Sequence, residues 1–182
     1  MEKPIENYWG LRLNRVKAAL EDNNFDVFIA GNAKEAVEIV QKKIIPGLNP
    51  ASVSWGGSMT FTAIGLYDAL KNSPDFDVLD TYAKQGNREE VIELRRKALL
   101  VDLFFTGTNA VTESGMLVNL DMIGNRVGAL TFGPKNVVVL TGRNKIVADL
   151  DEAMSRVKDY VAPANAMRLE MKTPCVGSGS CE

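Results

Sequence analysis

The sequence predicts an α/β fold in which a mostly parallel sheet is flanked by helices in three layers and carries an antiparallel hairpin insertion. Short apolar runs alternate with segments of helical periodicity along the chain. The runs are apolar at consecutive positions, as in strands that are covered on both faces. Between residues 107 and 120 the pattern changes to Thr-, Val- and Asn-rich pieces around a Ser-Gly turn, which favours a hairpin.

The expected helices are marked by apolar spacing and by start and stop signals. In the first expected helix, Trp9, Leu13 and Val16 recur at helical spacing and so lie on one face. The second begins at an N-cap signature in which Asn32 is followed three residues later by Glu35, and it ends before Pro46-Gly47. We expect helices over residues 1–24, 33–44, 58–70, 88–99 and 149–160. We expect strands over residues 25–30, 51–54, 76–79, 100–106 and 136–141.

Length and composition restrict the domain organisation and the function. A chain of 182 residues with 46% apolar and 24% charged residues can bury a core of its own. We expect one domain over residues 1–170, followed by a flexible Gly/Ser tail over 171–182. The net charge is −2, with basic and acidic residues interleaved, so nothing indicates a nucleic-acid partner.

The chain contains no histidine, which excludes Ser-His-Asp and Cys-His nucleophile systems and histidine-containing zinc sites. Two cysteines cannot complete a four-thiolate site, so no metal site is predicted. The N-terminus lacks an apolar signal core, and no apolar run is long enough to span a membrane. We therefore expect a cytoplasmic protein.

Ligands of open α/β sheets bind where strands end and helices begin, and three such places carry suitable residues. The first is Gly56-Gly57-Ser58, where two glycines allow close approach of a ligand and Ser58 offers a donor to an anion. The alternative is a tight turn in which Ser58 only caps the next helix. The turn is not a Walker A loop, because no Gly-Lys-Ser/Thr follows.

The second place is the segment from Gly107 to Gly115. Thr108 and Asn109 are candidate ligand-binding donors. Glu113 is a candidate catalytic carboxylate that binds a substrate hydroxyl or acts as base or nucleophile. The alternative is a solvated hairpin in which Asn109 satisfies turn backbone.

The third place includes Arg126, which can hold a carboxylate or phosphate bidentately with Asp121 orienting it. Asp121 can equally cap the helix that begins near Arg126. Lys145, after the last strand, is a further candidate ligand-binding cation or a solvated loop residue. In the tail, Cys175 and Cys181 match no closed motif; they contact a partner's metal or cluster, or nothing.

Several segments together resemble the LUD domain, the lactate-utilisation family. They are Trp55–Ser58, Ala98–Phe105 with Gly107–Gly115, Gly133–Val147 and Ala162–Leu169. The resemblance implies the fold shared by glucosamine-6-phosphate deaminase, ribose-5-phosphate isomerase and CoA transferases. It also implies a bacterial or archaeal cytoplasmic protein and, in some relatives, participation in the oxidation of lactate to pyruvate with iron–sulfur and flavin oxidoreductase subunits.

The expected function is that of a lactate-utilisation-type protein that binds a small anionic metabolite, as an accessory subunit in lactate oxidation. Relatives that serve as lactate-oxidation subunits can carry long cysteine-motif extensions for clusters, whereas this chain has only Cys175 and Cys181. We therefore expect these two cysteines to contact an iron–sulfur group through a partner. The alternative is an enzyme of acyl or CoA transfer. Thr112–Gly115 is similar to the Ser-Glu-Asn-Gly stretch of CoA transferases, which implies Glu113 as nucleophile. A third class is a purely structural subunit of an oxidoreductase complex.

Overall fold

The computed structural model describes residues 3–83 and 86–181, and the chain divides into two compact units. Unit 2 is the larger in sequence and comprises Ala30–Gly107 and Asp121–Thr141. Unit 1 is built from three separate pieces of chain: Met1–Ile29, Thr108–Leu120 and Gly142–Glu182. The chain passes repeatedly between these two units, each of which has its own sheet, and the single domain over residues 1–170 stays a prediction.

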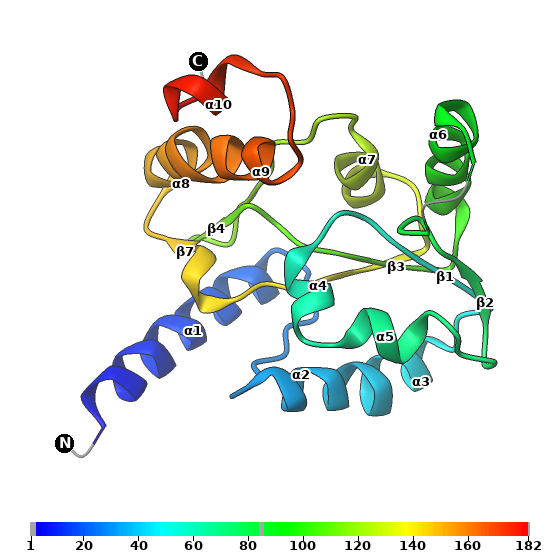
Figure 1. The fold of residues 1–182 in the computed structure, drawn as a ribbon. Coiled ribbons are helices and arrows are strands. Elements are labelled where there is room, and N and C mark those ends of the chain that lie inside the picture. Colours follow the sequence, from blue (N-terminus) through cyan, green and yellow to red (C-terminus); the bar gives the residue numbers. More distant parts are fainter. Residues whose placement is uncertain (1–2, 84–85, 182) are drawn as a thin grey trace. The chain divides into compact units, whose positions relative to one another are not determined.

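Unit 2 contains a four-stranded parallel sheet in the order β2-β1-β3-β6 (Figure 1). Its strands are β1 (Ser52–Trp55), β2 (Asp77–Leu79), β3 (Leu103–Thr106) and β6 (Asn136–Val139). All four fall within or next to apolar runs from which strands are predicted. The parallel pairing confirms the α/β class, because parallel neighbours require crossover helices between them.

Helices cover both faces of this sheet and so form three layers (Figure 1). One face carries α2 (Ala33–Ile39), the π-helical turn η1 (Val40–Ile44), α3 (Ile45–Leu48), α4 (Met59–Ala63) and α5 (Leu66–Leu70). The other face carries α6 (Arg88–Lys97), the 3₁₀ turn η2 (Ala98–Leu100) and α7 (Asn125–Thr131).

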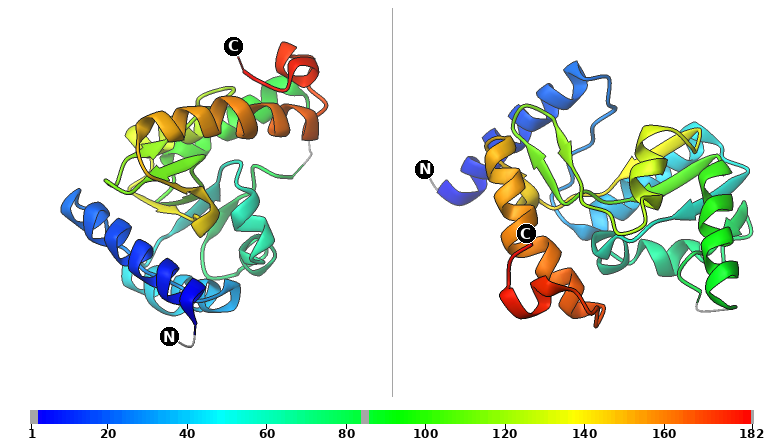
Figure 2. Two further views of the ribbon diagram at one scale, coloured as in Figure 1. Left: turned by 90° about the vertical axis from the view of Figure 1, so that its left-hand side faces the viewer. Right: turned by 90° about the horizontal axis from the view of Figure 1, so that it is seen from above.

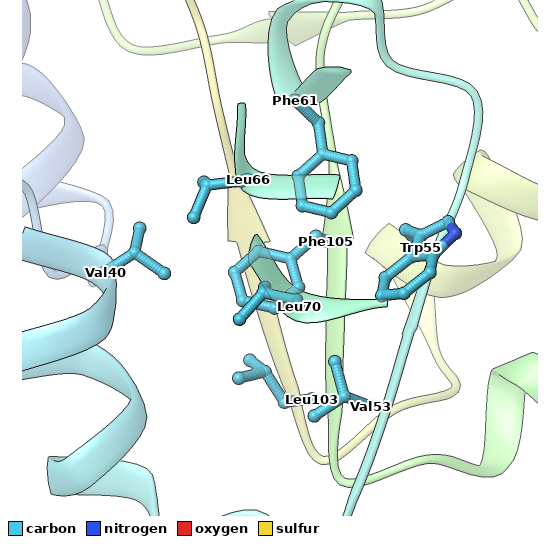
Figure 3. Packing of buried hydrophobic residues seen from close by; sticks show 8 residues of the cluster. All are labelled: Val40, Val53, Trp55, Phe61, Leu66, Leu70, Leu103 and Phe105. Atoms are coloured by element: carbon cyan, nitrogen blue, oxygen red, sulfur yellow. The ribbon is translucent and has the colours of Figure 1, made fainter. Parts of the chain in front are cut away.

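The strands of unit 2 send alternate side chains into two cores, one on each face. Leu103 and Phe105 belong to the larger cluster with Trp55 and Phe61, whereas Phe104 belongs to the other. Figure 3 shows the larger cluster, in which the Phe61 and Phe105 rings stack with centroids 5.5 Å apart. Because side chains alternate across a strand, burial on both faces explains why these runs are apolar throughout.

Unit 1 contains a three-stranded sheet in the order β5-β4-β7, formed by β4 (Ala110–Thr112), β5 (Leu117–Val118) and β7 (Ile146–Val147). The β4–β5 pair is antiparallel, which confirms the predicted hairpin, and β4–β7 is parallel. Helix α1 (Pro4–Asp22) packs on one face through Val16, and α8 (Leu150–Arg156) packs on the other through Ala153. Figure 2 shows both helices from two further sides.

Several predicted boundaries differ from the structure. Residues 25–30 form no strand. They are mostly exposed, and no strand of the described residues pairs with them. The helix over 58–70 is interrupted at Gly65, whose φ of +86° is left-handed.

Two helices continue beyond their expected ends at residues 44 and 160. Pro46 and Pro163 each lie in the first turn of a new α-helical segment, α3 and α9 (Ala162–Arg168), directly after the π-helical turns η1 and η4 (Val157–Val161). A proline is tolerated at a first-turn position because its missing N–H is not needed there.

The C-terminal segment has local structure where the sequence predicts a flexible tail. Helix α10 (Pro174–Ser178) buries Cys175, and the Cys181 N–H donates to the carbonyl of Lys158 at 2.9 Å. Ser180 Oγ donates to Asp159 at 2.9 Å. The mobility of this segment in solution stays a prediction, and Glu182 lies outside the described residues.

Among residues 3–83 and 86–181, no helix has both the length and the apolar character needed to cross a lipid bilayer.

Candidate functional site

The carboxyl ends of the parallel strands in unit 2 bring together the first group of predicted ligand-binding residues. Gly56, Gly57 and Ser58 follow β1, and Gly107 follows β3. The N–H of Gly56 still donates to the carbonyl of Phe105 at 2.9 Å, so the glycine turn starts as a continuation of the sheet. This edge is where open parallel sheets hold their ligands.

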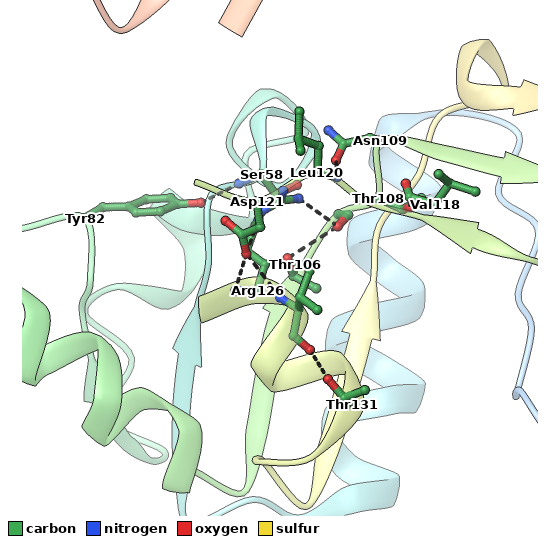
Figure 4. A network of polar contacts seen from close by, with 12 residues as sticks. Ser58, Tyr82, Thr106, Thr108, Asn109, Val118, Leu120, Asp121, Arg126 and Thr131 are labelled. Carbon is green, nitrogen blue, oxygen red and sulfur yellow. Dashed lines mark hydrogen bonds and ion pairs between the residues drawn. The ribbon is translucent and has the colours of Figure 1, made fainter. Parts of the chain in front are cut away.

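Ser58 has both of its local polar groups engaged (Figure 4). Its hydroxyl accepts from the N–H of Phe61 at 3.2 Å as the N-cap of α4, and its own N–H donates to the Tyr82 hydroxyl at 2.9 Å. The capping alternative raised from the sequence therefore describes Ser58. Helix α4 spans only five residues, and Ser58 is its N-cap.

Tyr82 is a site residue that the sequence analysis misses, and Asp80 holds it in place. The Asp80 carboxylate accepts from Trp55 Nε1 at 3.0 Å, from the Tyr67 hydroxyl at 3.0 Å and from the Tyr82 N–H at 2.8 Å. Burial, followed by the hydrogen bond to Asp80, raises the pKa of Tyr67. The available signal was an aspartate directly after a predicted strand, the position where site residues gather.

Arg126 lies against the glycine turn. A Cβ on Gly56 would stand 3.0 Å from Arg126 Cγ and 2.8 Å from Phe104 Cζ, and a Cβ on Gly57 would stand 3.8 Å from Arg126 Cδ. Gly56 is therefore required by the close approach of two side chains, whereas Gly57 has room for a methyl group. The side chain of Arg126 is only 11% exposed.

The charge of Arg126 lies between Asp121 and the end of β3 (Figure 4). Its Nε is 3.8 Å from Asp121 Oδ2, and an Nη donates to the Gly107 carbonyl at 3.5 Å. Asp121 Oδ2 also accepts from the backbone N–H groups of Arg126 at 2.8 Å and Val127 at 3.2 Å. Asp121 thus both caps α7 and orients Arg126, so the two alternatives from the sequence occur together.

The second group of predicted ligand-binding residues lies together in unit 1. Lys145 Nζ donates to the Thr108 carbonyl at 3.0 Å, and Arg156 Nε donates to the Asn109 carbonyl at 3.2 Å. The Thr108 hydroxyl donates to the carbonyl of Ala110 at 2.9 Å, and Asn109 Oδ1 accepts from the N–H of Leu120 at 2.8 Å. Lys145 and Arg156 therefore both bind the backbone of the loop that contains Thr108 and Asn109, and the side chains of this loop also form hydrogen bonds to backbone groups.

A further polar atom near this loop was not predicted. The Oδ1 atom of Asn119 is buried and has no hydrogen-bond partner among the described residues. Buried acceptors without partners are uncommon in native structures. Asn119 lies directly after β5, and no sequence pattern singles it out.

Glu113, the predicted catalytic carboxylate, is held by two arginines of α1. Arg12 Nε is 2.5 Å from Glu113 Oε1, and an Nη of Arg15 is 2.6 Å from Oε2. The hydrogen bonds from Arg15 and Arg12 hold the pKa of Glu113 below its usual range. Each carboxylate oxygen is therefore committed to a guanidinium group, and the pairs tie α1 to the hairpin that follows β4.

The predicted residues thus form separate groups. Gly56, Gly57, Ser58 and Arg126 meet in unit 2; Thr108, Asn109 and Lys145 meet in unit 1. Glu113 has its own ion-pair cluster in unit 1. A cleft shared by Glu113 and Ser58 stays a prediction, because the two residues belong to different units.

The cysteines do not fit a cluster held by this chain. An iron–sulfur cluster takes four thiolates, and Cys175 and Cys181 supply two. Cys175 is buried, with its Sγ 3.2 Å from Thr173 Oγ. Across the described part of the chain, no group of three or more Cys, Asp or Glu side chains could hold a metal ion.

The family model of the LUD domain matches residues 13–182 of the chain. Comparison with curated proteins and with solved structures found no match. The match includes α1 from Leu13 onward, both sheets and the C-terminal helices, and so covers nearly the whole of both units. It also includes every predicted site residue from Gly56 to Cys181. The chain belongs to the LUD domain family.

Proposed function

We propose that this chain is a lactate-utilisation-type protein that binds a small organic anion at the carboxyl edge of the unit 2 sheet, with Arg126 as the anion-binding side chain. The family's name indicates lactate utilisation, whose substrates and products are small carboxylates. The observation that carries the proposal is Arg126, a cation laid over Gly56 and Gly57 where parallel strands end.

Three features of the surroundings suit Arg126 to a carboxylate. Its guanidinium has the planar fork that binds a carboxylate bidentately. Its contacts with Asp121 and the Gly107 carbonyl, at 3.8 and 3.5 Å, hold the guanidinium at the ends of the strands, where the proposed carboxylate meets it. Its low exposure strengthens the attraction for an anion, since fewer water molecules screen the charge.

The neighbouring hydroxyl gives the ligand a second contact. The Tyr82 hydroxyl accepts from the Ser58 N–H at 2.9 Å and so lies at the same edge of the sheet, where the proposed ligand contacts it through a second oxygen atom. The sheet fixes this position, because Asp80 holds the Tyr82 backbone and is itself anchored to Trp55 and Tyr67. A 2-hydroxy or 2-oxo acid has a carboxylate for Arg126 and a second oxygen atom beside it.

In the same proposal the chain acts as an accessory subunit, and the redox chemistry resides in iron–sulfur and flavin subunits. The limited thiol content of the chain supports this division, because its own cysteines do not fit a cluster. The ion pairs of Glu113 support a structural role for that residue, so acyl transfer through Glu113 is not part of the proposed function.

Isothermal titration with L-lactate, pyruvate and inorganic phosphate tests the proposal. Arg126→Met should weaken carboxylate binding about 10- to 100-fold, the value of one or two charge-assisted hydrogen bonds. Arg168→Met removes an exposed arginine of α9 and serves as the matched control, with unchanged affinity expected. Equal affinity in Arg126→Met and the wild type, or no binding of either carboxylate by a folded wild type, would overturn the proposal.

A further inference from the structure

Helix α1 carries a row of exposed apolar side chains beside the face that packs on the unit 1 sheet. The packed face is formed by Trp9, Leu13, Val16 and Leu20. Ile5, Tyr8 and Leu11 are each more than half exposed and belong to none of the hydrophobic clusters that the described residues form. Residues three apart are neighbours on a helix surface, so these three side chains form a continuous row.

The ring of Trp9 holds two guanidinium groups next to this row. The Cζ atom of Arg12 is 5.4 Å from the ring centroid, and that of Arg143 is 5.2 Å from it. Arg143 belongs to the 3₁₀ turn η3 (Arg143–Lys145), so a distant segment of unit 1 brings a second cation to α1. An Nη of Arg12 also donates to the Tyr8 hydroxyl at 3.4 Å. A guanidinium that lies over an aromatic ring is held in a fixed orientation, with its N–H groups pointing outward along its edge.

This cluster carries more positive than negative charge. Arg12 and Arg15 share the single carboxylate of Glu113, and no carboxylate of the described residues forms an ion pair with Arg143. Two further bases of α1 are paired within the helix, Lys3 with Glu6 and Lys17 with Glu21. Like charges this close repel one another, so a negative charge supplied from outside would stabilise the cluster.

We propose that unit 1 docks an acidic segment of another protein on a surface, called here the α1 surface, formed by Tyr8, Trp9, Arg12, Arg15 and Arg143. Carboxylates of the segment bind Arg15 and Arg143, and an apolar side chain of the segment packs against Tyr8. All residues of the α1 surface belong to unit 1, so the proposal does not depend on the anion site at Arg126 in unit 2.

The residue types of the α1 surface favour a protein partner over a small molecule. Trp, Tyr and Arg are the residues that most often dominate the binding energy of protein–protein interfaces. Arg15 is 66% exposed and Tyr8 is more than half exposed, so these groups stand on the outside of a helix. Small-molecule sites instead enclose most of their ligand.

The same geometry favours an acidic protein segment over a lipid surface or a second copy of this chain. Glu113 and Trp9 fix the orientation of the guanidinium groups, which suits carboxylates at defined positions better than mobile lipid headgroups. A second copy docked through the same surface would bring arginines against arginines, because a two-fold contact joins identical patches.

The exposure of the arginines sets the expected strength of the contact. Exposed ion pairs contribute little individually, so the binding depends on several carboxylates together with one apolar contact. We expect a Kd of tens to hundreds of micromolar, which rises with salt concentration because the charges are exposed.

Binding of the full chain to a random copolymer of glutamate and tyrosine tests the proposal, with poly-glutamate of equal charge as the comparison. Fluorescence anisotropy of the dye-labelled polymers should give a Kd at least about fivefold lower for the copolymer, because only the copolymer supplies apolar side chains. Tryptophan emission, excited where tyrosine does not absorb, locates the contact. The chain has two tryptophans and Trp55 is fully buried, so unlabelled copolymer should change the emission of the wild type but not that of Trp9→Phe.

The double variant Arg15→Met/Arg143→Met removes the two proposed carboxylate ligands and should raise the Kd for the copolymer at least about tenfold. The matched control, Arg168→Met/Lys172→Met, removes the same charge from exposed residues of unit 1 and should leave the Kd within about twofold. Circular dichroism checks that each variant is folded.

The proposal is overturned if the wild type does not bind the copolymer or binds poly-glutamate equally well. It is also overturned if the double arginine variant binds like its control, or if Trp9→Phe keeps the emission change. Binding to phosphatidylserine vesicles without binding to the copolymer would assign the α1 surface to a membrane and overturn the proposal as well.

Discussion

Replacing Glu113 by glutamine tests whether its two ion pairs hold α1 to the hairpin of unit 1. The substitution keeps the size of the side chain but removes its charge and turns one acceptor atom into a donor that faces an arginine. Arg12 and Arg15 then keep their positive charges without a counterion. We expect the variant to fold and to be less stable.

The magnitude follows from the exposure of the three side chains. Glu113 is 20% exposed and Arg12 is 17% exposed, so their 2.5 Å contact is a charge-assisted hydrogen bond largely removed from water, with a contribution of about 2 kcal/mol. Arg15 is 66% exposed, so its contact contributes only about 0.5 kcal/mol. A total near 2.5 kcal/mol lowers the Tm of a chain of this size by about 5–10 °C.

The effect should depend on pH in a fixed direction. Hydrogen bonds from Arg15 and Arg12 lower the pKa of Glu113 in the folded chain below its usual 4.5. The unfolded chain therefore takes up the proton first, and the stability that Glu113 provides is complete above pH 4.5 and is lost as the pH falls through the folded-state pKa. The stability difference between wild type and Glu113→Gln should be largest near neutral pH and shrink below pH 4.5.

Thermal melts followed by circular dichroism at pH 7 and at pH 4 measure both effects. Glu6→Gln is the matched control, because Glu6 forms only an exposed pair with Lys3 and its loss should shift the Tm by less than a degree or two. Equal Tm values for wild type and Glu113→Gln at pH 7 would refute the structural role. Unchanged stability together with lost ligand affinity would instead assign Glu113 to a binding site.

Two further outcomes follow from the packing of each unit. Gly56→Ala should lower the free energy of unfolding in urea by about 1–3 kcal/mol, because its Cβ would stand 2.8 Å from Phe104 Cζ. Gly57→Ala should leave the free energy of unfolding nearly unchanged, and an equal loss in the two variants would contradict the geometry. A chain that ends at Glu170 should stay folded, and its Tm measured by circular dichroism should be about 2–4 °C lower, because it loses α10 and the buried Cys175. An unchanged Tm would show that this segment adds no stability.

The parallel sheet could be predicted from the sequence because both faces of its strands are buried. Leu103, Phe104 and Phe105 enter two different cores, so every position is apolar and the run is conspicuous. The run over 25–30 is equally apolar and forms no strand, because pairing depends on a neighbouring strand that local sequence does not reveal. Local sequence patterns likewise do not show the division into two units. It depends on contacts between segments far apart in the chain.

The sequence places the candidate site residues at strand and helix ends, but it does not show their contact partners. The glycine turn and Arg126 were found from their place at strand and helix ends, where ligands bind. The arginines that hold Glu113, Arg12 and Arg15, lie about a hundred residues away on α1. Nothing in the local sequence distinguishes them from other charged residues on the surface of a helix. Tyr82 was overlooked because its role depends on Asp80 and Ser58, which the fold alone brings to it.

A crystal structure of the full chain with L-lactate or pyruvate at saturating concentration tests the central claim most directly. The account predicts a carboxylate bound within 2.7–3.1 Å of the Arg126 guanidinium, beside Gly56 and Gly57 and within reach of the Tyr82 hydroxyl. A carboxylate bound away from Arg126, with the Arg126 contacts to Asp121 and Gly107 unchanged, would contradict it.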